Sequence, residues 1–172
     1  IEVTDDLRKK YNNQLLEFEQ NFIYPFGHDS FVISHGYNYF KFFDSLGKPY
    51  ILAITDKDRI VGVAVFILRN IDIYNSGKSE LVWYICDLKI HPDYRGKFII
   101  QDIFRFAIKK YGVITKKIYG ISMNSMPINN NRLINLANRI PIIDLSFQST
   151  LFFYLMRKNQ FDQISQTVKL YY

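Results

Sequence analysis

The chain has 172 residues, of which 48% are apolar, and its formal net charge at neutral pH is +6. This composition excludes a disordered chain, and the apolar runs are too short for a helix that crosses a bilayer. No signal peptide is visible, and the single cysteine, Cys86, excludes an intrachain disulfide and favours a cytoplasmic location. We expect one domain over residues 1–172, because no repeat or low-complexity linker divides the sequence.

Two apolar stripes predict helices in the N-terminal part of the chain. The first stripe covers residues 7–22 at steps of three or four, and Thr4 is placed to cap its helix. The second stripe covers residues 39–46 and is closed by Gly47 and Pro49. We therefore expect two amphipathic helices before the first strand.

The middle of the chain predicts strands. Residues 50–55 and 60–69 are rich in β-forming side chains on either side of a polar turn, which indicates a hairpin. A further strand is expected over residues 81–90, then a helix over residues 98–111 and a strand over residues 117–123. Such a strand–helix–strand crossover predicts that its two strands are parallel.

The C-terminal part favours a helix over residues 129–140, stopped by Pro141, and a last strand over residues 150–156. The order of elements indicates an α/β domain, of the α+β mixed-sheet kind, with a central mixed β-sheet flanked by helices. Ligands of such sheets favour the crevice beyond the carboxyl ends of the strands.

The segment HPDYRGKFII, residues 91–100, lies at that crevice, between a strand and a helix. A helix N-terminus attracts anions, Arg95 and Lys97 add positive charge, and Gly96 lets the backbone turn. From spacing alone, a solvated loop with a turn glycine is favoured over an anion site.

The strand LVWYICDLKI followed by HPDYRGKFII resembles the central motif of the GNAT superfamily, the acyl-CoA-dependent N-acyltransferases. The order of elements from about residue 31 to residue 156 is also similar to that of the family. In the family, a loop that begins with arginine or glutamine wraps the CoA pyrophosphate, and Arg95 matches that first position. Phe98 and Ile100 replace the small residues of the family's loop; a bulky side chain fits there if its φ stays negative and the side chain points into the core.

The resemblance implies acetyl-CoA as co-substrate and no metal. Main-chain groups on the last residues of the central strand would pair with the pantetheine arm, and loop amides would face the pyrophosphate. The strand over residues 117–123 would splay from its neighbour and leave a slot for the arm. Asn131 resembles the asparagine that opens the next helix in many members, although a helix cap explains it as well. The implied cofactor-binding residues are Leu88, Lys89, Ile90, Arg95, Gly96, Lys97, Phe98, Ile99, Asn124 and Asn131.

Acyl transfer to an amine needs a group that takes a proton from the ammonium, and Asp87 is the candidate for it. It is the only acidic residue within residues 81–90. Strict alternation places it on one face of the strand with Trp83, Ile85 and Lys89, unless a bulge intervenes. An ion pair with Lys89 or a structural hydrogen bond is the alternative role.

The proton donor for the leaving thiolate does not occupy the family's usual position in this sequence. Many GNAT members carry a tyrosine six residues after the helix-opening asparagine, but that position is Ala137 here. Tyr84 is taken as the candidate, with Tyr119, Tyr154 or water as substitutes.

Polar residues among aromatics, His28, Asp29 and His35, lie where the family has its variable substrate-binding helices, and we expect them to line an acceptor pocket. Turn capping and backbone hydrogen bonds are the alternative roles. A metal site is not expected, because the residues lack a recognisable ligand spacing. Cys86 lies in mid-strand, and we expect it to be buried and inert.

We expect an N-acetyltransferase that transfers an acetyl group from acetyl-CoA directly to a primary amine of a small molecule or protein, as a monomer or homodimer. The alternative is a catalytically inactive GNAT-fold module for CoA binding or protein interaction, which the altered loop and the missing tyrosine favour. Nucleic-acid binding is not expected, because the positive charges are scattered and the aromatic residues follow core-like periods. No membrane partner is expected.

Overall fold

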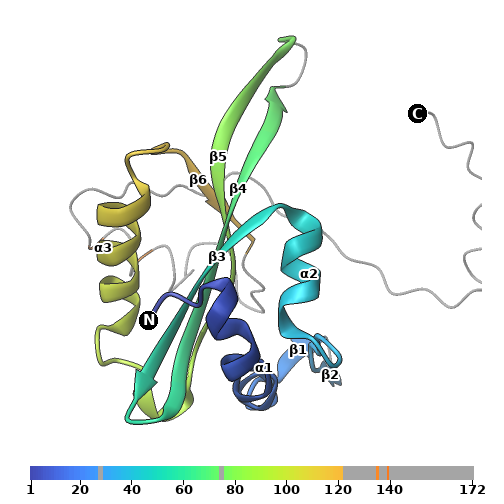
Figure 1. Cartoon of the computed structure of the whole chain (residues 1–172), viewed down its shortest axis with the longest axis vertical. Coiled ribbons are helices and arrows are strands. Elements are labelled where there is room, and N and C mark those ends of the chain that lie inside the picture. The colour runs from blue at the N-terminus through green and yellow to red at the C-terminus, as the bar shows by residue number, and fades with distance from the viewer. Residues whose placement is uncertain (27–28, 74–75, 122–134, 136–138, 140–172) are drawn as a thin grey trace, which may run out of the picture.

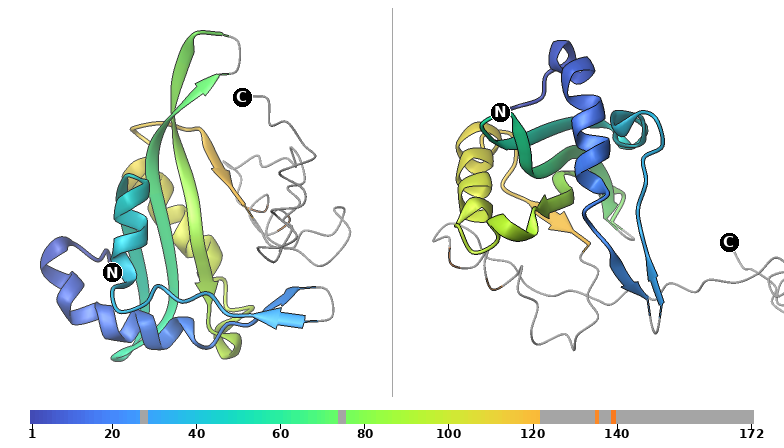
Figure 2. Two further views of the ribbon diagram at one scale, coloured as in Figure 1. Left: turned by 90° about the vertical axis from the view of Figure 1, so that its right-hand side faces the viewer. Right: turned by 90° about the horizontal axis from the view of Figure 1, so that it is seen from below.

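The computed structural model describes residues 1–26, 29–73, 76–121, 135 and 139. Its centre is a sheet of four strands in the order β3–β4–β5–β6 (Figure 1). Helices α1 and α2 lie on one face of this sheet, and α3 lies on the other (Figure 2). The predicted mixed sheet with flanking helices is therefore confirmed.

The two helices of the first face follow the predicted stripes. Helix α1 spans Asp5–Glu19 and α2 spans Tyr39–Leu46. Thr4 occupies the cap position of α1, but its hydroxyl donates to the Asp6 carboxylate at 2.6 Å and not to the helix backbone. Asn38 caps α2 by accepting from two amides of its first turn, at 3.0 and 3.3 Å. Both helices bury apolar side chains against the sheet, although Phe42 of the second stripe is 52% exposed.

The predicted hairpin is present, with longer strands than expected. Strand β3 spans Lys48–Asp56, β4 spans Arg59–Ile73 and β5 spans Lys78–Ile90, and β4 is antiparallel to both of the others. The far ends of β4 and β5 project beyond the sheet as an arm (Figure 1). A small ribbon of β1, Tyr24–Phe26, and β2, Asp29–Phe31, joins the two helices of the first face.

The crossover after β5 is also as predicted. A 3₁₀ turn, Pro92–Tyr94 (η1), leads to α3, Ile99–Tyr111, and then to β6, Ile118–Gly120. Strand β6 pairs with β5 in parallel. The core has one apolar cluster under α1 and α2 and a second one under α3.

Several predictions lie outside the described residues. These are the helix over residues 129–140, the strand over residues 150–156, and the site candidates His28, Asn124 and Asn131. In the part of the chain that the structure describes, no helix combines the length and the apolar character needed to cross a membrane.

Candidate active site

Strand β5 departs from regular pairing at Asp87 and Leu88. Val63 pairs with Lys89 and Val65 pairs with Cys86, so the single residue between the two valines faces two residues of β5. This is a β-bulge, and Asp87 adopts a left-handed conformation within it, with φ of 49°. A left-handed conformation is unfavourable for most residues other than glycine. Residues that are held in such a conformation occur often at functional sites.

The bulge places Asp87 on a different face from the one that strict alternation predicts. Trp83 and Ile85 pack in the cluster under α3, whereas Asp87 contacts Tyr39 of α2 on the opposite face. The prediction that Asp87 shares a face with Trp83 and Ile85 is therefore wrong, and its partnership with Lys89 is right. The physical reason is the inserted residue, which shifts the alternation by one position.

Asp87 is the centre of a buried polar cluster. Its Oδ2 accepts the hydroxyl hydrogen of Tyr39, and its Oδ1 forms an ion pair with Nζ of Lys89. The side chains of Asp87 and Lys89 are 9% and 4% exposed, and Tyr39 is fully buried. The ion pair of Asp87 with Lys89 thus matches the alternative role that the sequence offers for Asp87, but this ion pair is buried and does not lie on the surface. Burial and the negative charge of Asp87 raise the pKa of Tyr39 well above its usual value, so this tyrosine stays a donor.

The other titratable neighbours of Asp87 also keep their protons near neutral pH. Burial, and then the charge of Asp87, raise the pKa of the Cys86 thiol to about 12, although Lys89 acts in the opposite direction. Burial, Asp87 and Glu19 raise the pKa of Tyr24 to about 12. The half-buried Cys86 is therefore a poor nucleophile, as we expected for it.

Tyr84, the predicted proton donor, lies on β5 before the bulge, whereas the loop that leads to α3 comes after the bulge. Its ring stacks on Tyr119 of β6 with centroids 4.8 Å apart, and the Tyr119 hydroxyl accepts from Arg69 at 3.1 Å. Burial raises the pKa of Tyr84. Tyr84 also packs against the cluster under α1 and α2, but no described hydrogen bond joins it to Asp87, and its catalytic role stays a prediction.

The structure places two of the candidate acceptor-pocket residues, His35 and Asp29, in different surroundings. His35 is buried beside Glu19 of α1: its ring nitrogen pairs with one carboxylate oxygen, and its backbone N–H donates to the other at 3.0 Å. The His35 ring also lies 4.8 Å from the Tyr39 ring, between centroids. Asp29 is exposed on the β1–β2 ribbon, away from this pair. The structure therefore does not bring Asp29 and His35 together.

A hollow of about 220 Å³ lies beside the Glu19–His35 pair. Its wall combines part of α1 with the segment that leads from β2 to α2. The Glu19 carboxylate gives this wall an acidic group. The residues that line it are Leu16, Glu19, Gln20, Val32, Ile33, Ser34 and Gly36.

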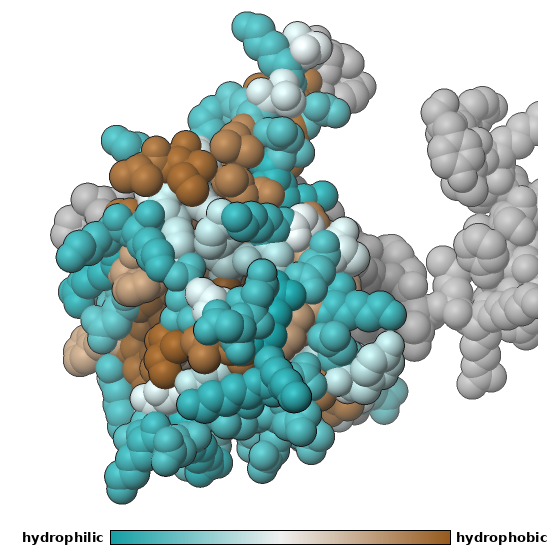
Figure 3. Space-filling view, viewed as in Figure 1, coloured by the Kyte–Doolittle hydropathy of each residue, from teal (hydrophilic) through white to brown (hydrophobic). Residues whose placement is uncertain are grey.

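A second hollow, of about 200 Å³, lies between the N-terminal residue, β3 and α3, near the apolar area beside α3 in Figure 3. It is mostly apolar, and Asp102 is the charged residue in its lining. None of the predicted catalytic residues lines it. We therefore place the candidate site on the α1–α2 face and at the α3 loop.

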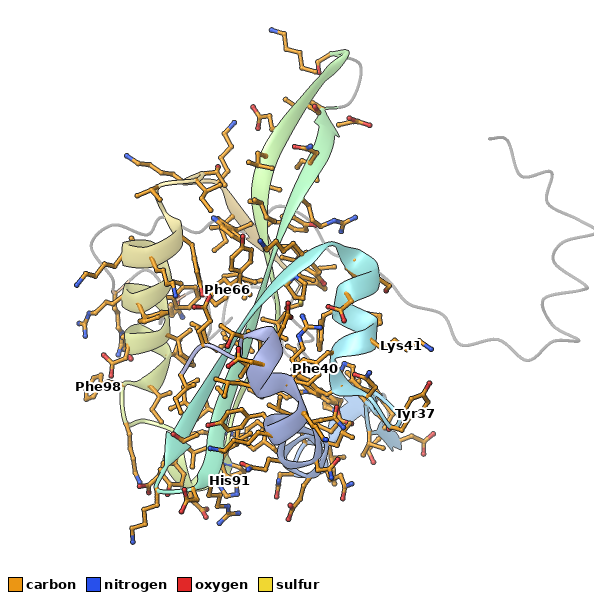
Figure 4. The ribbon with its side chains drawn as sticks, viewed as in Figure 1. Tyr37, Phe40, Lys41, Phe66, His91 and Phe98 are labelled. Atoms are coloured by element: carbon orange, nitrogen blue, oxygen red, sulfur yellow. The ribbon has the colours of Figure 1, made fainter. Side chains whose placement is uncertain are left out.

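The loop before α3 turns through two left-handed residues, Gly96 with φ of 81° and Phe98 with φ of 59°. Phe98 is 67% exposed and points away from the sheet (Figure 4). Phe98 therefore does not meet the condition under which a bulky side chain fits the family's loop, because its φ is positive and its side chain points outward. Phe98 occupies the cap position of α3, whereas Ile99 and Ile100, which follow it, pack against the cluster under α3.

Positive charge gathers at this entrance to α3. Arg95 and Lys97 are both exposed, and Nζ of Lys97 lies 4.2 Å from the centre of the Tyr94 ring. The Tyr94 hydroxyl in turn donates to Asp56 at 2.5 Å, which ties the loop to the β3–β4 turn. The first-turn N–H groups of α3 have no partner within a helix. These features together suit an anionic group.

Among the described residues, no strand pairs with the outer edge of β5 beside the bulge. Strand β6 pairs with β5 at Trp83, Tyr84 and Ile85, and the described pairing ends there. Past the bulge, Lys89 and Ile90 pair with β4 on the other side. Beyond the described end of β6, the predicted splay of the two strands stays a prediction.

Two residues of the cluster were not expected from the sequence. Tyr39 belongs to an apolar stripe, and Glu19 lies on a regular helix, so neither has a local signal for function. Within the described residues, His, Cys, Asp and Glu side chains form no group that could hold a metal ion.

No family model and no curated protein matches the chain. Solved structures do match it. An aminoglycoside acetyltransferase from an uncultured soil metagenomic sample, in complex with trehalose, is 15% identical with a TM-score of 0.57, over 91% of this chain and 95% of that one. A mutant BH1408 protein from Bacillus halodurans is also 15% identical, with a TM-score of 0.56 over 90% and 98% of the two chains. At these identities the likeness establishes the fold, which is the predicted GNAT fold.

Proposed function

We propose that this protein is an N-acetyltransferase that transfers an acetyl group from acetyl-CoA directly to a primary amine of a small molecule or protein. The observation that carries the proposal is the bulge in β5, which turns Asp87 into the α1–α2 face. The same strand runs on into the basic loop before α3. One strand therefore carries a carboxylate suited to an amine and leads to a site suited to a phosphate.

The proposed cofactor contacts use backbone groups of α3 and β5 that have no partner among the described residues. Arg95, Lys97 and the first-turn amides of α3 would hold the pyrophosphate, and the free edge of β5 at Leu88–Ile90 would pair with the pantetheine arm. Acetyl-CoA supplies the activated acetyl thioester. The exposed Phe98 leaves the loop backbone accessible, since its side chain points to solvent.

The proposed reaction moves two protons from the acceptor ammonium. Asp87 accepts the first, which leaves a neutral amine. The amine nitrogen bonds to the acetyl carbon as the carbon–sulfur bond breaks, which leaves a CoA thiolate. Tyr84 is the proposed donor of the proton that converts this thiolate to the thiol, because its raised pKa keeps it protonated, and the second proton of the amine nitrogen then replaces the proton that Tyr84 gave up.

The acceptor is proposed to enter from the α1–α2 face, where Asp87 and the hollow beside Glu19 lie. A structure of the soil acetyltransferase in complex with sisomicin, 16% identical to this chain, supports a small-molecule amine as the first class to test.

Calorimetry with acetyl-CoA tests the cofactor site. The double variant Arg95→Ala, Lys97→Ala is expected to bind at least about tenfold more weakly, because two charge-assisted contacts to phosphate are lost. The matched control, Lys9→Ala with Lys116→Ala, removes the same charge from exposed positions on α1 and after α3 and should bind normally.

A thiol-release assay over a panel of amines then tests catalysis. Release of CoA that depends on an added amine supports the enzyme. Binding of acetyl-CoA without turnover of any amine would contradict it and favour a CoA-binding module. If neither acetyl-CoA nor CoA binds, the proposal fails, and a protein-interaction role replaces it.

A further inference from the structure

Both oxygens of the Asp87 carboxylate are engaged by groups from different elements. Tyr39, from α2, donates to Oδ2, and Lys89, from β5 itself, pairs with Oδ1. The carboxylate is thus held from two sides, and both holding groups are buried. A residue that only filled space at this position would not need two polar partners.

We propose that Tyr39 and Lys89 are positioning residues, a clamp that keeps the Asp87 carboxylate ionised and aimed at the acceptor amine. This inference rests on the proposed acetyl transfer. An ionised carboxylate offers about four acceptor positions, of which the clamp uses two. The remaining positions can take a proton from an ammonium, directly or through a water molecule.

The need for the clamp follows from the bulge. The bulge turns Asp87 away from the α3 face, where strict alternation would place it, and into the cluster under α1 and α2, where burial alone disfavours the charged form of a carboxyl group. Hydrogen bonds and a cation favour the charged form. Tyr39 and Lys89 supply one of each at the position where the backbone forces the carboxylate inward.

The other groups near Asp87 do not replace the clamp. Tyr24 from β1 and Cys86 from β5 keep their protons, since burial raises the pKa of each to about 12. Glu19 from α1 is paired with His35. Among the described residues that contact Asp87 or act on its charged neighbours, Lys89 is the cation that faces the carboxylate.

The Tyr39→Phe variant tests the clamp, because it removes one hydroxyl and keeps the ring. We expect the acid limb of the pH profile of kcat/KM to move to higher pH by about 1 to 2 units, the equivalent of one lost hydrogen bond to a charged group. Acetyl-CoA binding by calorimetry should stay within about twofold, because the α3 loop does not contact Tyr39 in the structure.

The matched control is Tyr11→Phe. Tyr11 is a buried tyrosine of the same apolar cluster, but it belongs to α1 and is not among the groups that contact Asp87. This control should leave the acid limb in place. If both variants lose stability and neither moves the limb, Tyr39 has a structural role and the proposal is overturned.

A second measurement does not depend on turnover. In protein labelled with carbon-13 at the aspartate carboxyls, the NMR titration of Asp87 should move to higher pH in Tyr39→Phe and stay in place in Tyr11→Phe. An unmoved titration in Tyr39→Phe overturns the clamp. If the wild type binds acetyl-CoA but acetylates no amine, the proposed function fails, and the NMR titration still decides whether the clamp exists.

Discussion

The two faces of the sheet have opposite characters, although the same strands form both. The α3 face is an apolar cluster with Phe66, Trp83 and Ile103 among its members. The α1–α2 face combines an equally buried apolar cluster with charged and polar groups, namely Glu19, His35, Tyr39, Asp87 and Lys89.

This difference separates a mostly apolar face from a face that carries buried charged groups. Burial of apolar surface is a reliable source of folding free energy, and the α3 face supplies it, with the Tyr111 hydroxyl and the Gln101 amide among its few buried polar groups. Buried charges are costly unless they are paired, and replacing such pairs by apolar residues is often neutral or stabilising. We interpret the charged α1–α2 face as a feature kept for function.

The strongest way to break this division is Asp87→Asn, which keeps the shape and removes the charge. We expect turnover to fall by about 10²- to 10⁴-fold, because the proton acceptor is lost, while acetyl-CoA affinity stays nearly unchanged. Steady-state kinetics and calorimetry check the two parts. Asp72→Asn, on the exposed arm of β4, is the control, and unchanged turnover in Asp87→Asn would remove Asp87 from the mechanism.

Ile103→Ala probes the opposite face. The substitution leaves a cavity in the apolar cluster under α3, so we expect the free energy of unfolding to fall by about 2 to 5 kcal/mol. The pH profile of activity should keep its shape in the fraction that remains folded. Urea unfolding measures the loss, and Phe106→Ala, at an exposed position of the same helix, is the comparison that should show little change.

A smaller effect on the free energy of unfolding is expected at alkaline pH, from Cys86 on the charged face. Burial and Asp87 raise the pKa of Cys86 from 9.0 to about 12, so above pH 9.0 the unfolded chain loses a proton that the folded chain keeps. This contribution to stability is therefore complete below pH 9.0 and is lost as the pH rises toward 12. Urea unfolding of the wild type and Cys86→Ala across this range should show a steeper decline for the wild type; parallel curves would contradict the shift.

The smallest effect is expected at the loop that joins the two faces. Phe98→Gly removes the steric cost of the left-handed conformation but adds flexibility to the unfolded chain, so the net gain in the free energy of unfolding should be at most about 1 kcal/mol. Gly96→Ala, at φ of 81°, should lower it by a similar amount. Thermal unfolding measures the stability of both variants. A loss of stability in Phe98→Gly would contradict a left-handed conformation at Phe98.

Much of the fold follows from local patterns. The apolar period of residues 98–111 predicts α3, and the polar turn between two β-rich runs predicts the β3–β4 hairpin, because both patterns act over a few neighbouring residues. Of the site, the sequence indicates Asp87 as the acid of the central strand and Arg95 and Gly96 as loop residues. The role of each still stays a prediction.

The tertiary structure alone decided the rest of the site. A bulge depends on the pairing of β4 with β5, so the sequence of β5 does not show that Asp87 changes face. Tyr39 and Asp87 are 48 residues apart, and their contact exists because α2 packs over the bulge. Local periodicity determines which residues form helices and strands, whereas contacts between distant elements determine which polar side chains meet.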